Sequence, residues 1–112
     1  MNKSLKDMVG GDITNIISVE GYWQLKTNKF LVTIYNPLKY LTIKNELLDI
    51  NMTDTEMFIN SVITKVVYKE RSQLILELEN NRKLYILLRD NDYVGPEALS
   101  ILYNSGEIIV VQ

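Results

Sequence analysis

Apolar and polar residues alternate along most of the chain, in short runs that end at glycine, asparagine or charged residues. Runs of this length that are rich in Val, Ile, Leu and Tyr predict β-strands. The alternation is clearest on both sides of Asn28-Lys29 and of Asn80-Asn81-Arg82, where it predicts two antiparallel hairpins. Each hairpin then has one apolar face for a core and a more polar face for solvent.

The chain contains an internal repeat. Residues Met8–Ile17 align without a gap with Phe58–Val67, and the apolar positions match at all but one place. Two further strands of similar length follow each aligned segment. The pattern therefore predicts two repeated three-strand meanders, over residues 4–37 and 54–89.

The length of each connecting turn decides which residues lie opposite each other, since a slip of one residue turns every side chain to the other face. Two-residue turns at Glu20-Gly21 and Asn28-Lys29 join the first three strands, and three-residue loops at 70–72 and 80–82 join the second three. The apolar pairs that these turns predict are Ile16–Leu25, Leu25–Val32, Trp23–Ile34, Val66–Leu76, Tyr68–Leu74, Leu76–Ile86 and Leu74–Leu88. On the opposite face, the polar pairs that they predict are Glu77–Tyr85 and Glu79–Lys83.

Short helical turns are expected before each meander. Ser4 can cap a turn that runs to Val9, and Thr53 or Asp54 can cap a second turn over Thr55–Ile59. The first strand of each meander is apolar on both faces, and these turns, the other meander or a second copy of the protein could cover it.

The remaining segments complete a mainly β fold. A strand is expected at 40–43, and residues 98–111 predict a C-terminal hairpin across Asn104-Ser105-Gly106. The fold class is therefore mainly β with short helices, in a single domain over residues 1–112. Evenly spaced short strands favour an antiparallel sandwich or a partly open barrel, here of about eight or nine strands.

The composition narrows the chemistry. The 112 residues include neither cysteine nor histidine, and the formal net charge is −2 from 12 basic and 14 acidic residues. Without these two residue types, thiolate chemistry, ordinary zinc sites and a histidine general base are excluded. The basic residues are scattered among acids, which disfavours nucleic acid as a partner. We expect no cofactor and no bound metal.

The hydropathy pattern bears on location. No run of apolar residues approaches the length of a membrane-spanning helix, and the first residues lack the apolar segment of a signal peptide. We therefore expect a cytoplasmic protein with no membrane partner.

The densest polar segment runs from Asp90 to Gly95. Its acids at the first and third positions and its glycine at the sixth resemble the opening of a calcium loop, but Val94 and Ile101 stand where two further ligands belong. We interpret the segment as a polar loop whose aspartates accept hydrogen bonds from their own backbone.

Two pairs of acids are close enough in sequence to suggest acid–base chemistry: Glu77 with Glu79, and Asp92 with Glu97. Neither pair is expected beside an apolar pocket that would raise the pKa of a carboxyl group. We therefore predict no catalytic residues and no enzyme.

The chain has seven tyrosines and one tryptophan, many for its length. Tyr22 and Tyr35 are expected opposite each other on the polar face of the first hairpin, and Tyr85 on the same face as Glu77. Tyrosines beside carboxylates are typical of an interface with a protein partner; the alternative is that they lie under the helices or between the two units, as core. The predicted protein-binding candidates are Glu77, Glu79, Tyr85, Asp90, Asp92, Tyr93, Glu97, Tyr22 and Tyr35.

Three segments carry a resemblance to known proteins: Ile34-Tyr35-Asn36-Pro37, Asp92-Tyr93-Val94-Gly95-Pro96-Glu97-Ala98-Leu99 and Gly106-Glu107-Ile108-Ile109-Val110. In these turn markers the chain resembles a group of small bacterial β-rich proteins without assigned activity, some similar to immunity proteins of toxin–immunity systems. The resemblance implies a cytoplasmic binding protein that neutralises a cognate toxin by occluding its active surface. It assigns no function to individual residues.

The sequence leaves three functions open. The first is a non-enzymatic protein-binding module, of the immunity type, that uses the outer face of the second meander and the Asp90–Glu97 loop. The second is a small-molecule-binding domain that uses the interior of an open barrel, with Trp23 at its mouth. The third is a structural homo-oligomer, such as a homodimer, joined through strands that are apolar on both faces. The Asp90–Glu97 loop is where we look first for a binding surface.

Overall fold

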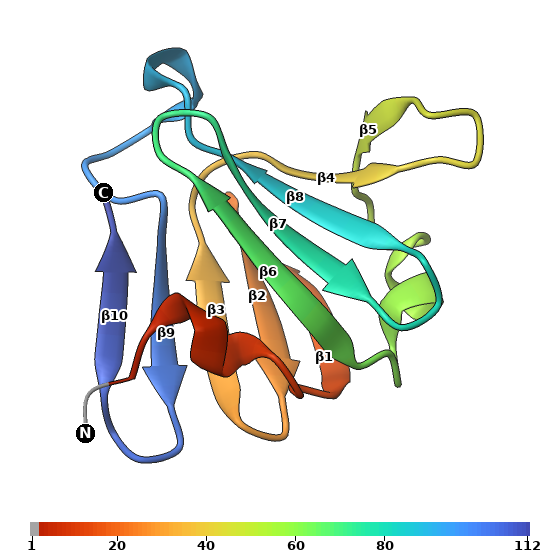
Figure 1. Ribbon diagram of the computed structural model, residues 1–112. Coiled ribbons are helices and arrows are strands. Elements are labelled where there is room, and N and C mark those ends of the chain that lie inside the picture. The colour runs from red at the N-terminus through yellow and green to blue at the C-terminus, as the bar shows by residue number, and fades with distance from the viewer. Residues whose placement is uncertain (1–2) are drawn as a thin grey trace.

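The fold is a sandwich of two antiparallel five-stranded sheets (Figure 1). It was determined as a computed structural model, which describes residues 3–112; Met1 and Asn2 of the predicted domain lie outside the described residues. The predicted mainly β class is confirmed, and of the two predicted architectures the structure has the sandwich.

The two sheets are built in the same way. The first contains, in spatial order, β1 (Ile13–Val19), β2 (Tyr22–Thr27), β3 (Phe30–Ile34), β9 (Leu99–Tyr103) and β10 (Ile108–Val111). The second contains β6 (Ile63–Lys69), β7 (Gln73–Leu78), β8 (Lys83–Leu87), β4 (Leu38–Leu41) and β5 (Leu47–Asp49). Three short 3-10 helices accompany them: η1 (Leu5–Met8), η2 (Thr55–Phe58) and η3 (Asp90–Asp92).

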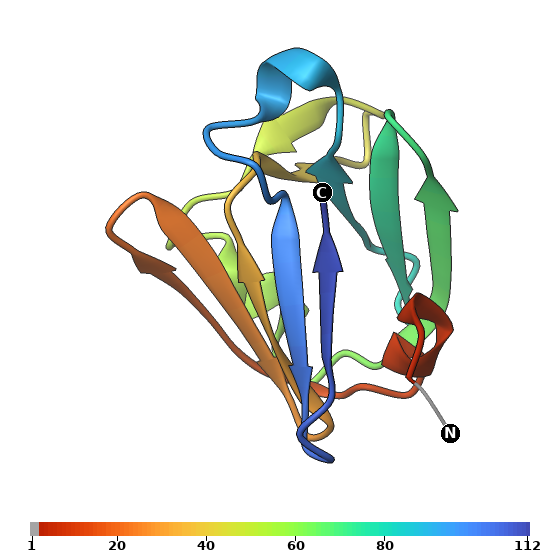
Figure 2. The same cartoon turned by 90° about the vertical axis from the view of Figure 1, so that its left-hand side faces the viewer.

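Each half of the chain completes the sheet of the other half. The meander β1–β2–β3 begins the first sheet, but the hairpin β4–β5 that follows it pairs with β8 in the second sheet. The meander β6–β7–β8 begins the second sheet, and the hairpin β9–β10 that follows it pairs with β3 in the first. Figure 2 shows the blue C-terminal hairpin beside the orange strands of the first meander.

The two meanders are also joined at their beginnings, through residues that the repeat makes equivalent. The amide of Gly10 donates to the carbonyl of Ile63 (2.7 Å), and the amide of Asn60 donates to the carbonyl of Ile13 (2.7 Å). Gly10 and Asn60 both have positive φ, 90° and 64°, which glycine and asparagine tolerate best. The two halves are therefore related by an approximate twofold axis at this junction.

The core lies between the sheets and is closed by the short helices. Met8 of η1 and Phe58 of η2 are buried, as the repeat places them. The predicted first cap is confirmed: the amide of Ser4 donates to the carboxylate of Asp7 (2.6 Å), and this bond lowers the pKa of Asp7. The largest fully buried side chains are Phe30, Phe58, Met8, Ile13, Ile16, Leu25, Ile34, Ile63, Leu74, Leu76, Leu84 and Ile86.

Three of the four predicted turns have the predicted register. Ile16 faces Leu25, Trp23 faces Ile34 and Val66 faces Leu76. These pairs belong to the β1–β2, β2–β3 and β6–β7 ladders.

The predicted register of the fourth turn, between β7 and β8, is wrong by two residues. The amide of Leu78 donates to the carbonyl of Arg82 (2.9 Å), so the loop is 79–81, and Asn81 closes it with a positive φ of 65°. Leu76 therefore pairs with Leu84 instead of Ile86. A shift of two residues leaves each side chain on its predicted face, but it changes the neighbours: Glu77 pairs with Lys83, Tyr85 with Ile75, and Leu74 with Ile86.

The connection between the repeats contains more strand than expected. The strand predicted at 40–43 is β4, which begins at Leu38, and β5 follows it as a short partner that the sequence pattern does not indicate. The described residues thus form ten strands, against the eight or nine expected.

Candidate functional site

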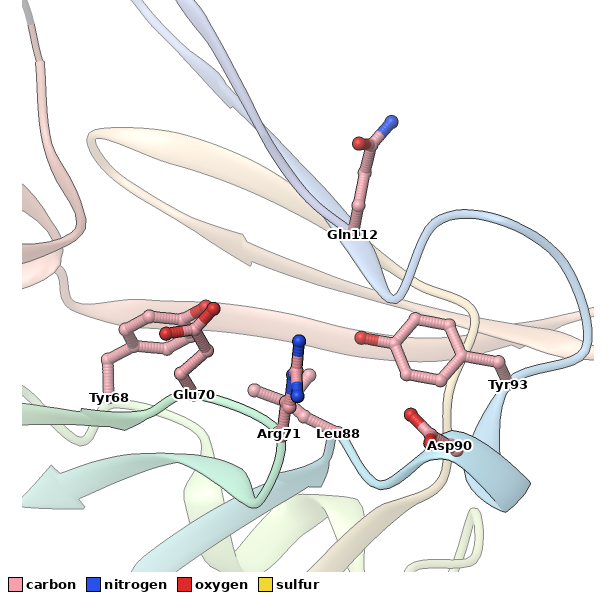
Figure 3. Close-up of a pocket in the computed structure, with 7 residues that line it drawn as sticks. All are labelled: Tyr68, Glu70, Arg71, Leu88, Asp90, Tyr93 and Gln112. Carbon is pink, nitrogen blue, oxygen red and sulfur yellow. The ribbon is translucent and has the colours of Figure 1, made fainter.

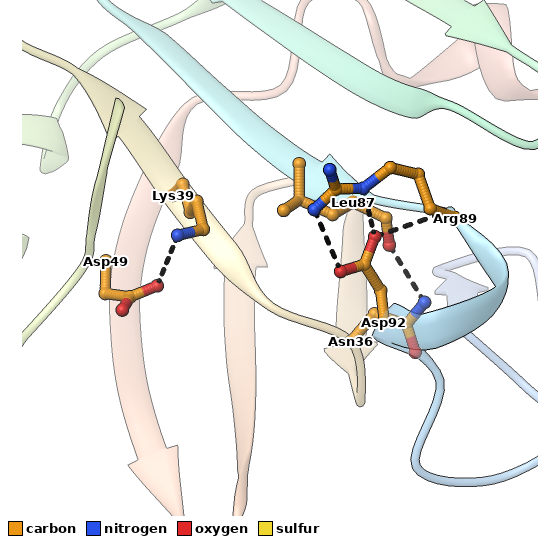
Figure 4. Close-up of polar contacts among 6 residues, drawn as sticks. All are labelled: Asn36, Lys39, Asp49, Leu87, Arg89 and Asp92. Carbon is orange, nitrogen blue, oxygen red and sulfur yellow. Dashed lines mark hydrogen bonds and ion pairs between the residues drawn. The ribbon is translucent and has the colours of Figure 1, made fainter. Parts of the chain in front are cut away.

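The loop after β8 rises above one end of the sandwich, as Figures 1 and 2 both show. It begins with η3, whose shape is held by Arg89 and Asp92 (Figure 4). The Asp92 carboxylate accepts hydrogen bonds from the Arg89 amide (3.0 Å) and from its guanidinium (3.1 and 3.3 Å). The bond to Asp92 raises the pKa of Arg89. Asp92, a predicted binding residue, is therefore engaged within its own loop, as the interpretation of a self-bonded polar loop expects.

The base of the loop is tied to both sheets by Asn36, which follows β3 and is only 2% exposed. Its backbone amide donates to the carbonyl of Ala98 (3.2 Å), where the loop ends. Its side-chain Nδ2 donates to the carbonyl of Leu87 (2.9 Å), where β8 ends (Figure 4). Leu87 in turn donates to the carbonyl of Pro37 (3.1 Å). Because Pro37 has no N–H to return that bond, the Asn36 side chain supplies the missing donor.

A second polar contact holds the neighbouring hairpin. The Lys39 ammonium of β4 lies 3.1 Å from the Asp49 carboxylate of β5 (Figure 4). Because the Asp49 side chain is exposed to solvent, this ion pair adds little to the free energy of unfolding. Its main effect is to connect β4 to β5.

A hollow of about 370 Å³ lies between the loop and the β6–β7 turn (Figure 3). Tyr68 enters it from the end of β6 and Tyr93 from the loop, and their hydroxyl groups point toward each other across it. The guanidinium of Arg71 stands between the two rings. We call this space the tyrosine hollow; its lining residues are Tyr68, Glu70, Arg71, Leu88, Asp90, Tyr93 and Gln112.

The charged groups of the tyrosine hollow are available for a partner. Within residues 3–112, Arg71 forms no ion pair with a carboxylate, and neither do Glu70 and Asp90 with a basic group. The pKa of Tyr93 is raised, first by burial and then by Tyr68 and the nearby aspartates. Tyr93 therefore keeps its proton at neutral pH and can donate a hydrogen bond.

The other side of the loop is more apolar. Val94 stands at the tip with 83% of its surface exposed. A hollow of about 220 Å³ beside it is lined by Tyr35, Val94, Gly95, Pro96 and Glu97, and an adjoining hollow of about 250 Å³ reaches Trp23. The predicted Tyr22–Tyr35 pair is confirmed, because the two rings lie 5.7 Å apart.

The loop therefore joins two hollows into one continuous surface. We call it the loop-end surface and define it by the residues that face solvent there: Tyr35, Tyr68, Arg71, Asp90, Tyr93, Val94 and Glu97. Four of these, Tyr35, Asp90, Tyr93 and Glu97, are among the predicted candidates.

The structure separates three of the other predicted candidates, Glu77, Glu79 and Tyr85, from this surface. Of the remaining two, Tyr22 contacts Tyr35 and Asp92 lies within the loop. Glu77 and Glu79 lie at the opposite end of the second sheet, around a hollow of about 530 Å³ that also contains Arg82. Tyr85 lies on the outer face between Ile75 and Lys39. Glu77 and Glu79 are therefore about a strand length from the loop, because β8 runs from the Glu79 end of the sheet to the loop.

The sequence pattern missed Tyr68 and Arg71. Tyr68 pairs with Leu74, so its face predicts burial, yet it is 45% exposed because it lies at the end of β6, beyond the core. Arg71 occupies the β6–β7 turn with a positive φ of 62°. Both residues lie at the β6–β7 turn. In a three-strand meander this turn is at the same end of the sheet as the segment that follows the third strand, here the Asp90–Glu97 loop, and this position is the signal that could have found them.

The arrangement offers hydrogen-bond donors, a guanidinium that has no carboxylate partner among residues 3–112, and an exposed apolar tip. Such groups are suited to binding. Within residues 3–112, no three His, Cys, Asp or Glu side chains are grouped so that they could hold a metal ion. The same residues include no helix of the length and apolarity needed to cross a membrane. Comparison of the chain with family models, curated proteins and solved structures gives no match.

Proposed function

We propose that the chain is a non-enzymatic protein-binding module that recognises its partner through the loop-end surface. The observation that carries this proposal is the combination of Val94, 83% exposed at the loop tip, with two tyrosines and Arg71 in the hollow beside it. Tyrosine and arginine are enriched among the residues that dominate binding energy at protein interfaces. The exposed Val94 side chain between the two hollows can also fit into a complementary pocket of a partner.

The rigidity of the loop supports this role. The Arg89–Asp92 contacts fix the first turn of the loop, and Asn36 holds the two ends of the loop, by its side chain at Leu87 and by its backbone amide at Ala98. A surface that is already ordered loses less conformational entropy when it binds, which favours affinity.

Within this class, we propose an immunity-type role, in which the loop-end surface covers the active surface of a cognate toxin in the cytoplasm. The sequence resemblance supports it. The surface itself carries Arg71 beside Glu70 and Asp90, so it suits a partner of mixed charge better than a strongly basic nucleic-acid site.

The small-molecule alternative has less support. Its proposed location was the interior of a barrel, whereas the space between the two sheets is filled by buried side chains. The tyrosine hollow, at about 370 Å³, is near the lower limit of ligand pockets.

The test compares three tagged forms of the chain in extracts of cells that produce it naturally: wild type, a loop-end variant (Val94→Asp with Arg71→Asn) and a far-end control (Glu79→Gln with Arg82→Gln). Asparagine is chosen at position 71 because it tolerates the positive φ there. We expect a protein that the wild type and the control retain equally, and that the loop-end variant binds at least about tenfold more weakly. Equal retention by all three forms, or no retained protein, would contradict the proposal.

A further inference from the structure

Among the four edge strands that residues 3–112 form, β10, with four residues, has neither a charged residue nor a bulge to prevent pairing with another strand. Natural edges are blunted by charged residues, bulges or short length. In the second sheet, β5 has only three residues, and β6 carries lysines and a bulge near its start. In the first sheet, β1 has a bulge between Ile13 and Asn15. β10 reads Ile-Ile-Val-Val, with no charge, proline or bulge.

Within residues 3–112, the backbone groups on the outer side of β10 have no hydrogen-bond partner. The amide of Tyr103 donates to the carbonyl of Glu107 (2.9 Å), and Ile109 lies opposite Ile101. In an antiparallel ladder, alternate residues bond to the same neighbour. Residues 107, 109 and 111 therefore face β9, and Ile108 and Val110 direct their N–H and C=O groups away from the sheet. Figure 1 shows β10 as the outermost strand on that side.

The side chains beside these groups are apolar and exposed. Ile108 is 65% and Val110 43% exposed on the outer face of the sheet, next to Leu102 of β9 at 45%. A strand that paired with β10 would therefore gain backbone hydrogen bonds and an apolar row together.

We propose that this edge is occupied by a second copy of the chain, through antiparallel pairing of β10 with β10 about a twofold axis at Ile109. In that register Ile108 lies opposite the second copy's Val110, and the reverse. The two N–H and two C=O groups that each strand directs outward then bond to one another, so both strands are fully satisfied.

The strand is its own complement in side chains as well as in backbone. Residues 108–111 of each copy are all apolar, and Glu107, just before the strand, lies opposite the second copy's Val111, so the two acids do not meet. An isologous contact of this kind closes as a dimer and does not extend into a fibre.

The dimer is independent of the proposed partner site. Because the two β10 strands run antiparallel, the loop-end surfaces of the two copies lie at opposite ends of the pair, with their apolar tips free. A contact of four residues on each strand is small, so we expect weak and concentration-dependent association.

The test is sedimentation equilibrium of the full chain between about 10 μM and about 1 mM. The average mass of the wild type should rise from 13.0 kDa toward twice that value. Val110→Lys places a charge in the pair, and Val110→Pro removes an outward N–H that the β9–β10 ladder does not use. Both variants should weaken association at least about tenfold. Val19→Lys, on the other edge strand of the same sheet, is the matched control and should associate as the wild type does.

A wild type that stays monomeric up to about 1 mM would overturn the inference, and so would equal association of Val110→Lys and Val19→Lys. Circular dichroism checks that each variant is folded, and Val110→Lys still decides the matter if the proline variant does not fold. The extract experiment above, repeated with Val110→Lys, tests the two proposals separately. A variant that no longer dimerises but still retains the partner protein shows that the loop-end surface binds without the dimer.

Discussion

At the scale of single residues, Asn36 shows how one side chain repairs a backbone defect. Pro37 lies opposite Leu87 at the start of the β4–β8 ladder and cannot donate a hydrogen bond. The Asn36 side chain donates to the Leu87 carbonyl in its place, at 2.9 Å, in a site that water scarcely reaches. The loop-end surface is built on this contact.

Asn36→Ala should therefore lower the free energy of unfolding by about 1–3 kcal/mol, because it leaves a buried carbonyl without a donor. Urea denaturation followed by circular dichroism measures the loss. Adding Pro37→Ala to that variant returns an N–H to position 37 and should recover part of the stability. If the double variant is no more stable than Asn36→Ala, the account of this contact is wrong.

Tyr103 makes the stability of the chain depend on pH in the alkaline range. Its hydroxyl donates to the carbonyl of Ser4 (2.8 Å), and burial, followed by the charge of Asp7, raises its pKa to about 12. In the unfolded chain a tyrosine loses its proton near pH 10, so between these values the folded state holds the proton more tightly.

Stability should consequently be complete below about pH 10 and fall as the pH rises toward about 12, since the unfolded state then binds fewer protons. Tyr103→Phe removes the ionising group and should unfold with a shallower dependence over the same range. Thermal unfolding at stepped pH measures both curves; identical slopes would show that Tyr103 does not carry the effect.

The residue scale also shows which binding residues sequence reasoning can reach. The contact between Tyr22 and Tyr35 follows from a two-residue turn and strand alternation, both local properties. The exposure of Tyr68 could not be predicted, because its strand face indicates burial. Whether the core extends to the end of β6 depends on the other sheet.

At the scale of elements, the turns decide the register of each ladder. The β6–β7 ladder could be predicted because its loop, 70–72, is bounded by clear strand patterns. The β7–β8 ladder could not, because Glu79, Asn80, Asn81 and Arg82 all suit a turn. The Leu78–Arg82 hydrogen bond and the positive φ of Asn81, both properties of the folded structure, show which three of them form the loop.

Asn81→Val should destabilise the chain by about 1–2 kcal/mol, because a β-branched residue is strained at this φ of 65°. Asn81→Gly is the matched variant and should stay within about 0.5 kcal/mol of the wild type, since glycine accepts positive φ. Thermal melting of the wild type and the two variants checks this order of stability. A valine variant as stable as the glycine variant would mean that the loop does not need this conformation.

At the scale of the whole molecule, the exchange of hairpins makes the two halves depend on each other. Leu99 and Ile101 of the C-terminal hairpin are buried and pair with Ile34 and Val32 of the first meander, although the hairpin follows the second meander. The repeated meanders could be predicted from aligned apolar positions. The exchange could not, because the hairpins would pair equally well by pattern with either sheet.

A chain ending at residue 97 should lose its cooperative unfolding transition. The removed hairpin buries several side chains worth about 1.5–3 kcal/mol each, which together approach the stability of a small domain. Adding a peptide of residues 98–112 should restore the transition and the β-sheet signal in circular dichroism. A sharp transition from the shortened chain alone would show that its own half suffices.

The central claim is that a protein partner meets the loop-end surface, and site-specific photo-crosslinking in cells that produce the chain naturally tests it most directly. A photoreactive residue replaces Val94 at the loop tip in one form and Arg82, at the far end of the second sheet, in the other. We predict a discrete crosslinked protein from position 94 that is absent from position 82. No product from position 94, or the same product from both positions, would contradict the claim.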